Sequence, residues 1–170
     1  MSDMPYFHPT CFIHPLAVVL GDVTLGSRAS VWPTAVLRAD GDVIVVGADS
    51  NIQDGAVLHV DVGIPCSIGQ RVTIGHRAIV HGATVEDDCL IGMGAIILNR
   101  AVIGTGSVIG AGALVSEGAV IPPRSIVLGV PGRVVKPVDD AMAERTRANA
   151  QAYVDLAALH RAGTFTQHSP

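Results

Sequence analysis

The sequence is short of aromatic residues, charged residues and long apolar runs, and each shortage excludes a class of protein. One Trp, two Tyr and three Phe among 170 residues predict a narrow interior lined by small aliphatic side chains. The formal net charge of −4 gives no basic surface, so we expect no nucleic-acid partner. No apolar run approaches the roughly 20 residues of a membrane span, and the start "MSDMPYFHP" lacks a signal-like leader, so we expect no membrane partner.

The three cysteines, Cys11, Cys66 and Cys89, are an odd number without CxxC spacing. This pattern favours reduced thiols over a disulfide framework or a cysteine zinc site. Together with the absence of a leader, it predicts a cytoplasmic protein, and the length of 170 residues suits one domain with a small appendage.

The most informative feature that is present is a repeat of six residues. Large aliphatic residues recur at Ile13, Val19, Leu25, Val31, Leu37 and Val43, then in shifted phases at Val46, Ile52, Leu58, Ile68, Ile74, Val80, Val85, Ile91, Ile97, Ile103, Ile109, Val115, Ile121 and Val127. This period fits neither an α-helix nor an alternating strand. It predicts a parallel β-helix in which three hexads form one triangular coil, with the aliphatic residue inside. Glycine follows the aliphatic in many hexads, where we expect it to permit unusual turn dihedrals.

The repeat ends at "GVPGRVVKP", and a segment rich in helix-forming residues follows. We expect a β-helix domain with a short lead-in over residues 1–136, a C-terminal helix over 137–163 and a loose tail over 164–170. Asp139 or Asp140 is expected to cap the helix and Gly163 to end it. One apolar stripe is expected to pack the helix along the prism, and it consists of Met142, Tyr153, Leu156 and Leu159.

Two histidines lie where the repeat slips, and hexad counting places them on one face. The slips follow Val43, Leu58 and Val80, and departures from a solenoid repeat map to loops and binding surfaces. If the second slip is a short insertion, Leu58 and Val80 lie three hexads apart. His59 and His81, directly after them, then stack about one strand spacing apart. If the slip after Val43 is also an insertion, Arg38 takes the same position one coil earlier.

His76 belongs to the hexad that begins at Ile74, on a second face of the triangle that also carries Gln53. Within one subunit His76 should therefore not reach His59 and His81. A threefold trimer would bring this second face against the first face of a neighbour. Three neutral imidazoles with an open fourth position form the ligand set of a catalytic zinc. The alternative is that these are ordinary solvated histidines, as is expected for His8, His14, His160 and His168.

Five segments of the sequence resemble the γ-class carbonic anhydrase family. They are "LRAD" (37–40), "NIQDGAVLH" (51–59), "GHRAIVH" (75–81), "GMGA" (92–95) and a tyrosine, Tyr153, in the C-terminal helix. The resemblance implies a left-handed β-helix, a homotrimer, and a zinc ion, alternatively iron or cobalt. It also implies reversible hydration of CO₂ to bicarbonate by a metal-bound hydroxide at the trimer interfaces.

The resemblance also implies roles for individual residues. His59 and His81 would be metal ligands from one subunit, and His76 would be the ligand from its neighbour. Gln53 would orient the hydroxide, with Asn51 near the site and Tyr153 at the border of the cavity. Three residues would form or support ion pairs at the trimer interface, namely Arg38, Asp40 and Asp54.

Two departures from the family pattern bear on the activity. Ala39 stands where the family has glycine, and Gly41 and the loop "VDVGIPC" replace segments that carry proton-shuttling glutamates in other members. Asp61 is the one carboxylate of that loop, so we expect turnover to be limited by proton transfer. The short loop matches a subclass of the family of which some members are labelled ferripyochelin-binding.

Two alternative functions stay open from the sequence. One is a weakly active or non-catalytic metal-binding scaffold, related to siderophores or to a larger assembly. The other is a hexapeptide acyltransferase with coenzyme A along the prism and a single histidine as general base. The acyltransferase reading leaves two of the three central histidines and Gln53 unexplained.

Overall fold

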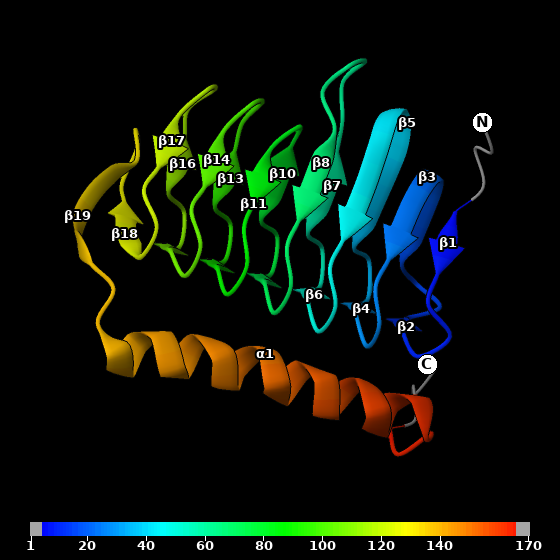
Figure 1. Ribbon diagram of the computed structural model, residues 1–170. Coiled ribbons are helices and arrows are strands. Elements are labelled where there is room, and N and C mark those ends of the chain that lie inside the picture. The colour runs from blue at the N-terminus through cyan, green and yellow to red at the C-terminus, as the bar shows by residue number, and fades with distance from the viewer. Residues whose placement is uncertain (1–4, 166–170) are drawn as a thin grey trace, which may run out of the picture.

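In the computed structural model, which describes residues 5–165, the chain winds into a left-handed parallel β-helix with one α-helix running along it (Figure 1). Each hexad contributes a short strand and a turn, and strands of successive coils pair in parallel, as in Leu90↔Thr73 and Ile91↔Ile74. The fold class predicted from the six-residue period is therefore confirmed.

The prism has three faces. Face one consists of the first half of β3 (Val18–Leu25), the first half of β5 (Val36–Val46), β7 (Val57–His59), β10 (Ile79–His81), β13 (Ile96–Ile97) and β16 (Leu114–Val115). Face two consists of β2 (Phe12–Ile13), β4 (Ser30–Val31), β6 (Asn51–Ile52), β9 (Thr73–Ile74), β12 (Leu90–Ile91), β15 (Val108–Ile109), β18 (Ser125–Leu128) and the antiparallel β19 (Arg133–Pro137). Face three consists of β1 (Tyr6–Phe7), the second halves of β3 and β5, β8 (Cys66–Ile68), β11 (Thr84–Val85), β14 (Val102–Ile103) and β17 (Val120–Ile121).

The core is a column of aliphatic side chains along the axis of the prism. Ile52, Leu58 and Ile97, which begin hexads on faces one and two, are 0% exposed. The small residues four positions later, such as Ala56 and Ala101, are also 0% exposed and fill the tight corners of the triangle. Burial of this column supplies the main free energy that holds the coils together.

The expected inward position of Val43 is wrong. Val43 is 37% exposed, whereas Ile44 and Val46 are buried. The physical reason is that β5 continues from face one to face three, and the β3–β5 register shifts between Gly21 and Val23. The extra residues of β5 lie outside the pairing with β3 at this corner, so the strand re-enters the core at Ile44.

The expected reason for glycine after the aliphatic is also wrong for most hexads. Of the glycines in that position, Gly21 has a positive φ of 76°, but Gly104 does not. A Cβ on Gly104 would lie 2.5 Å from the backbone nitrogen of Pro123 in the next coil. Glycine is required there because adjacent coils approach closely, not because the turn needs a special dihedral.

The C-terminal helix α1 (Asp140–Arg161) begins three residues after the expected position 137, since Pro137 still belongs to β19. Asp139, one of the two expected caps, accepts a hydrogen bond of 2.7 Å from the Met142 N–H. Helix α1 lies along face two, next to β2, β4, β6 and β9 (Figure 1). Its buried residues are the small Thr146, Ala150 and Ala157.

Leu159 of the expected stripe is 46% exposed, so that part of the stripe was wrong. Among residues 5–165, no helix combines the length and the apolarity that crossing a membrane requires. The expected loose tail at 164–170 lies mostly outside the described residues.

Stability should depend on the axial column rather than on the outward side chains. Ile103→Ala, at a position that is 0% exposed, is expected to lower the free energy of unfolding by about 2–5 kcal/mol, because it leaves a cavity in the prism. The matched control is Val120→Ala, since Val120 is 71% exposed on the neighbouring strand and should cost less than about 0.5 kcal/mol. Urea unfolding at one fixed protein concentration checks this, and equal losses for the two variants would contradict it.

Candidate metal centre

His59 and His81 stack on face one, as hexad counting predicted. They are register partners on β7 and β10, and Arg38 on β5 is the register partner of His59 on its other side. The two ring centroids are 4.8 Å apart, and His59 Nδ1 lies 2.8 Å from His81 Nε2. Parallel pairing of adjacent coils alone brings the two imidazoles together.

The second nitrogen of each ring faces an oxygen. His59 Nε2 lies 3.0 Å from Asp40 Oδ1, and His81 Nδ1 lies 2.6 Å from the side-chain oxygen of Asn99. Because these oxygens accept hydrogen bonds, the nitrogens that face them carry the protons. The two remaining nitrogens, His59 Nδ1 and His81 Nε2, then direct their lone pairs toward each other. Neutral imidazoles bind a metal ion through such unprotonated nitrogens.

His76 lies on face two, in the turn after β9, and its side chain is 41% exposed. Its Nδ1 lies 3.0 Å from Asp54 Oδ2, which leaves Nε2 as the free lone pair. All three histidines thus have one nitrogen against an oxygen acceptor, the arrangement in which metal-ligating histidines are usually held. The donor set therefore fits a zinc-type ion.

One chain does not complete a three-ligand centre. Across the described part of the chain, no group of three or more His, Cys, Asp and Glu side chains is placed to hold a metal ion. The expectation that His76 does not join His59 and His81 within one subunit agrees with this result. The ligand roles of the three histidines remain predictions.

Asn51 and Gln53 form a buried polar chain on face two. Gln53 Nε2 donates to Asn51 Oδ1 at 2.9 Å, and Asn51 Nδ2 donates to Thr73 Oγ1 at 3.0 Å. Asn149 from α1 donates to the same hydroxyl at 3.0 Å. Both Asn51 and Gln53 are at most 4% exposed. These hydrogen bonds orient the amide of Gln53 with its nitrogen toward Asn51, so its side-chain oxygen is left to accept a further hydrogen bond.

A pocket of about 180 Å³ lies between face two and α1, and its lining includes Gln53, His76 and Tyr153. Tyr153 packs edge-on against Trp32 with ring centroids 5.3 Å apart. Burial, and then the negative charge of Asp54, raise the pKa of the Tyr153 hydroxyl. The hydroxyl therefore stays protonated at neutral pH and can donate a hydrogen bond into the pocket.

The three residues expected at the trimer interface are not brought together within one chain. Arg38 and Asp40 form an ion pair on the face-one side, and this pair and the contact with His59 lower the pKa of the Asp40 carboxyl. Asp54 instead contacts His76 from face two. The interface roles of these residues stay predictions.

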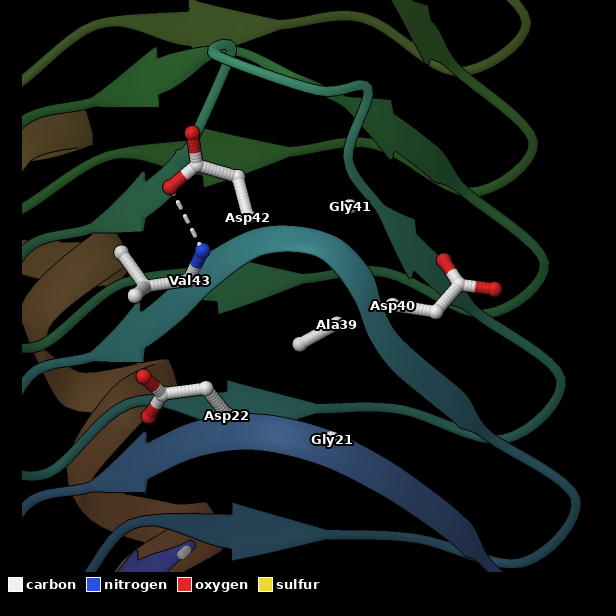
Figure 2. A pocket seen from close by; sticks show the side chains of 7 residues that line it. All are labelled: Gly21, Asp22, Ala39, Asp40, Gly41, Asp42 and Val43. Carbon is white, nitrogen blue, oxygen red and sulfur yellow. Dashed lines mark hydrogen bonds between the residues drawn. The ribbon is translucent and has the colours of Figure 1, made fainter. Parts of the chain in front are cut away.

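A wider hollow of about 570 Å³ at the corner of β3 and β5 does not form a second centre. Figure 2 shows the Asp40 carboxyl directed away from Asp42, while the Asp42 carboxyl turns back to the Val43 N–H at 2.7 Å. Asp22 adds a third carboxylate to the lining, but the three do not converge on one point (Figure 2).

Sequence reasoning missed the polar partners of these residues, namely Asn99, Thr73 and Asn149. Asn99 was detectable in principle, because Ile97 is the register partner of Val80. Counting two residues onward places Asn99 over the turn that follows His81. Asn149 offered no such signal, since the rotation of a helix against the prism depends on packing.

The chain is similar to a known family and to several known proteins. The family described as "Bacterial transferase hexapeptide (six repeats)" matches residues 82–117. A "Probable carbonic anhydrase" from Methanocaldococcus jannaschii is 57% identical over 140 residues, which cover 82% of this chain and 88% of that protein. The "Carnitine operon protein CaiE" of Escherichia coli is 38% identical over 96% of this chain and 86% of that protein. A putative acetyltransferase of Bacillus cereus has a TM-score of 0.92 at 34% identity, with 94% and 93% of the two chains covered.

The Tyr153 hydroxyl should titrate above the ordinary tyrosine value of about 10. The chain has two tyrosines, so a Tyr6→Phe variant leaves Tyr153 as the sole reporter. After chelation of any bound metal, an ultraviolet absorbance titration should show tyrosinate forming at higher pH than in free tyrosine. Adding Asp54→Asn should bring the midpoint part of the way back, because the carboxylate is the second cause of the shift. An ordinary midpoint before that change would contradict the assignment.

Proposed function

Because the chain belongs to the hexapeptide-repeat family that contains the probable carbonic anhydrase of M. jannaschii and the CaiE proteins, we propose that it is a metal-dependent lyase that interconverts CO₂ and bicarbonate. The observation that carries the proposal is the pair His59 and His81, whose facing nitrogens are 2.8 Å apart while the other nitrogens face acceptors. Zinc suits three imidazoles best, with iron or cobalt as alternatives.

We place the centre between subunits of a homotrimer. His59 and His81 on face one of one subunit would meet His76 on face two of its neighbour. An outward ladder of aliphatic residues on face one supports this contact, because such a surface gains from being covered. The ladder runs in register along the prism through Val18, Val36, Val57, Ile79, Ile96 and Leu114. Heterologous contacts of this kind close into a ring of three.

The residues of face two would orient the reactants. A bound zinc ion supplies a Lewis acid and lowers the pKa of a coordinated water to about 7. Gln53 offers its free side-chain oxygen to a water O–H, because its nitrogen is already held by Asn51. Tyr153 offers a protonated hydroxyl to an oxygen of CO₂ or bicarbonate in the pocket beside His76. These groups orient without changing charge.

Proton transfer would limit the rate. Asp61, the carboxylate of the short loop, accepts a hydrogen bond of 2.8 Å from the Asn99 amide and so already has a partner. We therefore expect the turnover to rise with the concentration of an external buffer. A scaffold that binds metal but catalyses little would show no such rise.

An acyltransferase is the competing function, since the B. cereus protein with 34% identity is named a putative acetyltransferase. A single general base needs one histidine, whereas three histidines here each turn one nitrogen to an acceptor. The hypothesis of a metal site explains all three histidines. The three cysteines are free thiols, which suits a reducing cytoplasm, and we include that location in the proposal.

Loss of any one ligand should strip the metal. His59→Ala, His76→Ala and His81→Ala are each expected to weaken Zn²⁺ binding by more than about 100-fold, beyond the cost of losing a residue that only supports a ligand. CO₂ hydration followed by stopped flow should fall with the metal content. His8→Ala is the control, because His8 contacts Thr10 far along the chain from this site. Full activity in metal-free His81→Ala protein, or tight coenzyme A binding without metal, would reject the proposal.

Mixing two inactive variants tests the location between subunits. His76→Ala and His81→Ala chains, co-expressed in equal amounts, should regain about a quarter of the sites, since an intact site needs each variant on the correct side of one interface. The mass in solution should be three times the 17.5 kDa of one chain. If the three ligands come from one subunit, the mixture stays inactive.

A further inference from the structure

We infer that Asn99 is the positioning residue that fixes the proton of His81 on Nδ1 and thereby keeps Nε2 available to bind a metal ion. The inference rests on the proposed function and names a residue that the ligand set does not include. Asn99 lies in the turn between β13 and β14 on the coil after His81, and its side-chain oxygen is 2.6 Å from His81 Nδ1.

The orientation of the Asn99 amide follows from its second partner. Its nitrogen donates to Asp61 Oδ2 at 2.8 Å. A carboxylate only accepts hydrogen bonds, so the amide nitrogen must face Asp61 and the amide oxygen must face His81. Because an oxygen cannot donate, His81 Nδ1 must carry the proton. The carboxylate at the surface thus determines the tautomer of the imidazole two contacts away.

The backbone around Asn99 leaves room for this contact and for little else. A Cβ on Gly82, directly after His81, would lie 2.5 Å from Asn99 Oδ1 and 2.7 Å from Ile64 Cγ2. Gly82 also accepts a 2.7 Å hydrogen bond from the Arg100 N–H, which holds the Asn99 turn in place. The absence of a side chain at position 82 therefore lets the Asn99 amide reach the ring.

The insertion after His59 carries Asp61, the residue that orients the Asn99 amide. Its turn is closed by a 2.9 Å hydrogen bond from the Ile64 N–H to the Asp61 carbonyl, and Gly63 adopts a φ of 74° within it. This tight turn holds Asp61 against Asn99. The loop that lacks a shuttle glutamate thus has a different use, which is to orient a ligand through Asn99.

The test measures the tautomer and the metal separately. In metal-free protein with ¹⁵N-labelled histidine at about pH 8, where an ordinary imidazole is neutral, the His81 signal should report a proton on Nδ1. The signal is assigned by its loss in His81→Ala. In Asn99→Ala it should change to a mixture of tautomers, and Zn²⁺ affinity should fall about 10–100-fold. Circular dichroism and the mass in solution verify that the variants fold and assemble.

Two further variants and one control sharpen the test. The exchange Asp61→Asn with Asn99→Asp keeps an acceptor against His81 and a donor behind it, so it should restore the tautomer and the affinity. Asp61→Ala alone frees the amide to rotate and should give a partial loss. Glu117→Ala is the matched control. Glu117 occupies the position equivalent to Asn99 on the next coil, since Val115 is the register partner of Ile97, and it contacts Arg100 instead of a histidine.

The outcomes separate the positioning role from the proposed function. An unchanged His81 tautomer and unchanged Zn²⁺ affinity in Asn99→Ala would overturn the role of Asn99, and so would a wild-type His81 with its proton on Nε2. If the tautomer responds as expected while the wild type binds no Zn²⁺, the proposed lyase function fails but Asn99 still positions His81.

Discussion

Each coil of the prism hydrogen-bonds to the coils before and after it, and this parallel register decides which side chains meet. The pairing of β7 with β10 sets His81 on His59, and the pairing of β10 with β13 brings the Asn99 turn over Gly82. The contact between the two imidazoles follows from the constant stacking distance between coils, whereas the Asn99 contact also requires the absence of a side chain at Gly82. The backbone pairing of the coils therefore sets the spacing of His59 and His81.

The division of the site between two faces follows from the triangular section. A chain that turns every six residues cannot point consecutive hexads the same way, so His76 and His81 must diverge although five positions separate them. In the proposed trimer, the face-one surface of one subunit would meet the face-two surface of its neighbour. The buried amides of Asn51 and Gln53 and the pocket under α1 lie on the face-two side of the prism, with His76.

Hexad counting predicted the faces and the stacked histidines, because both depend on short-range spacing. Residue type at the helix start predicted a cap at Asp139 or Asp140, of which Asp139 is the cap. Sequence reasoning failed for features that the spacing of residues does not determine. The lengths of insertions do not say which residue returns to the core, so Val43 was placed inside although Ile44 is buried. The need for Gly104 comes from the next coil, about one full turn later. The contact between Asp54 and His76 depends on the path of a turn, which periodicity does not describe.

At the corner between His59 and Ile68, the number of residues can change without changing how His59 and His81 are placed relative to each other. The residues inserted there protrude from the prism, and the strands on either side keep their pairing with the coils around them. Additions or deletions at this corner can therefore change the groups beside His59 and His81 while the strand register that spaces the two histidines stays constant. Evolution or protein engineering can therefore exchange the side chains of this corner, and with them the partner that Asp61 provides for Asn99, without altering the pairing of the coils.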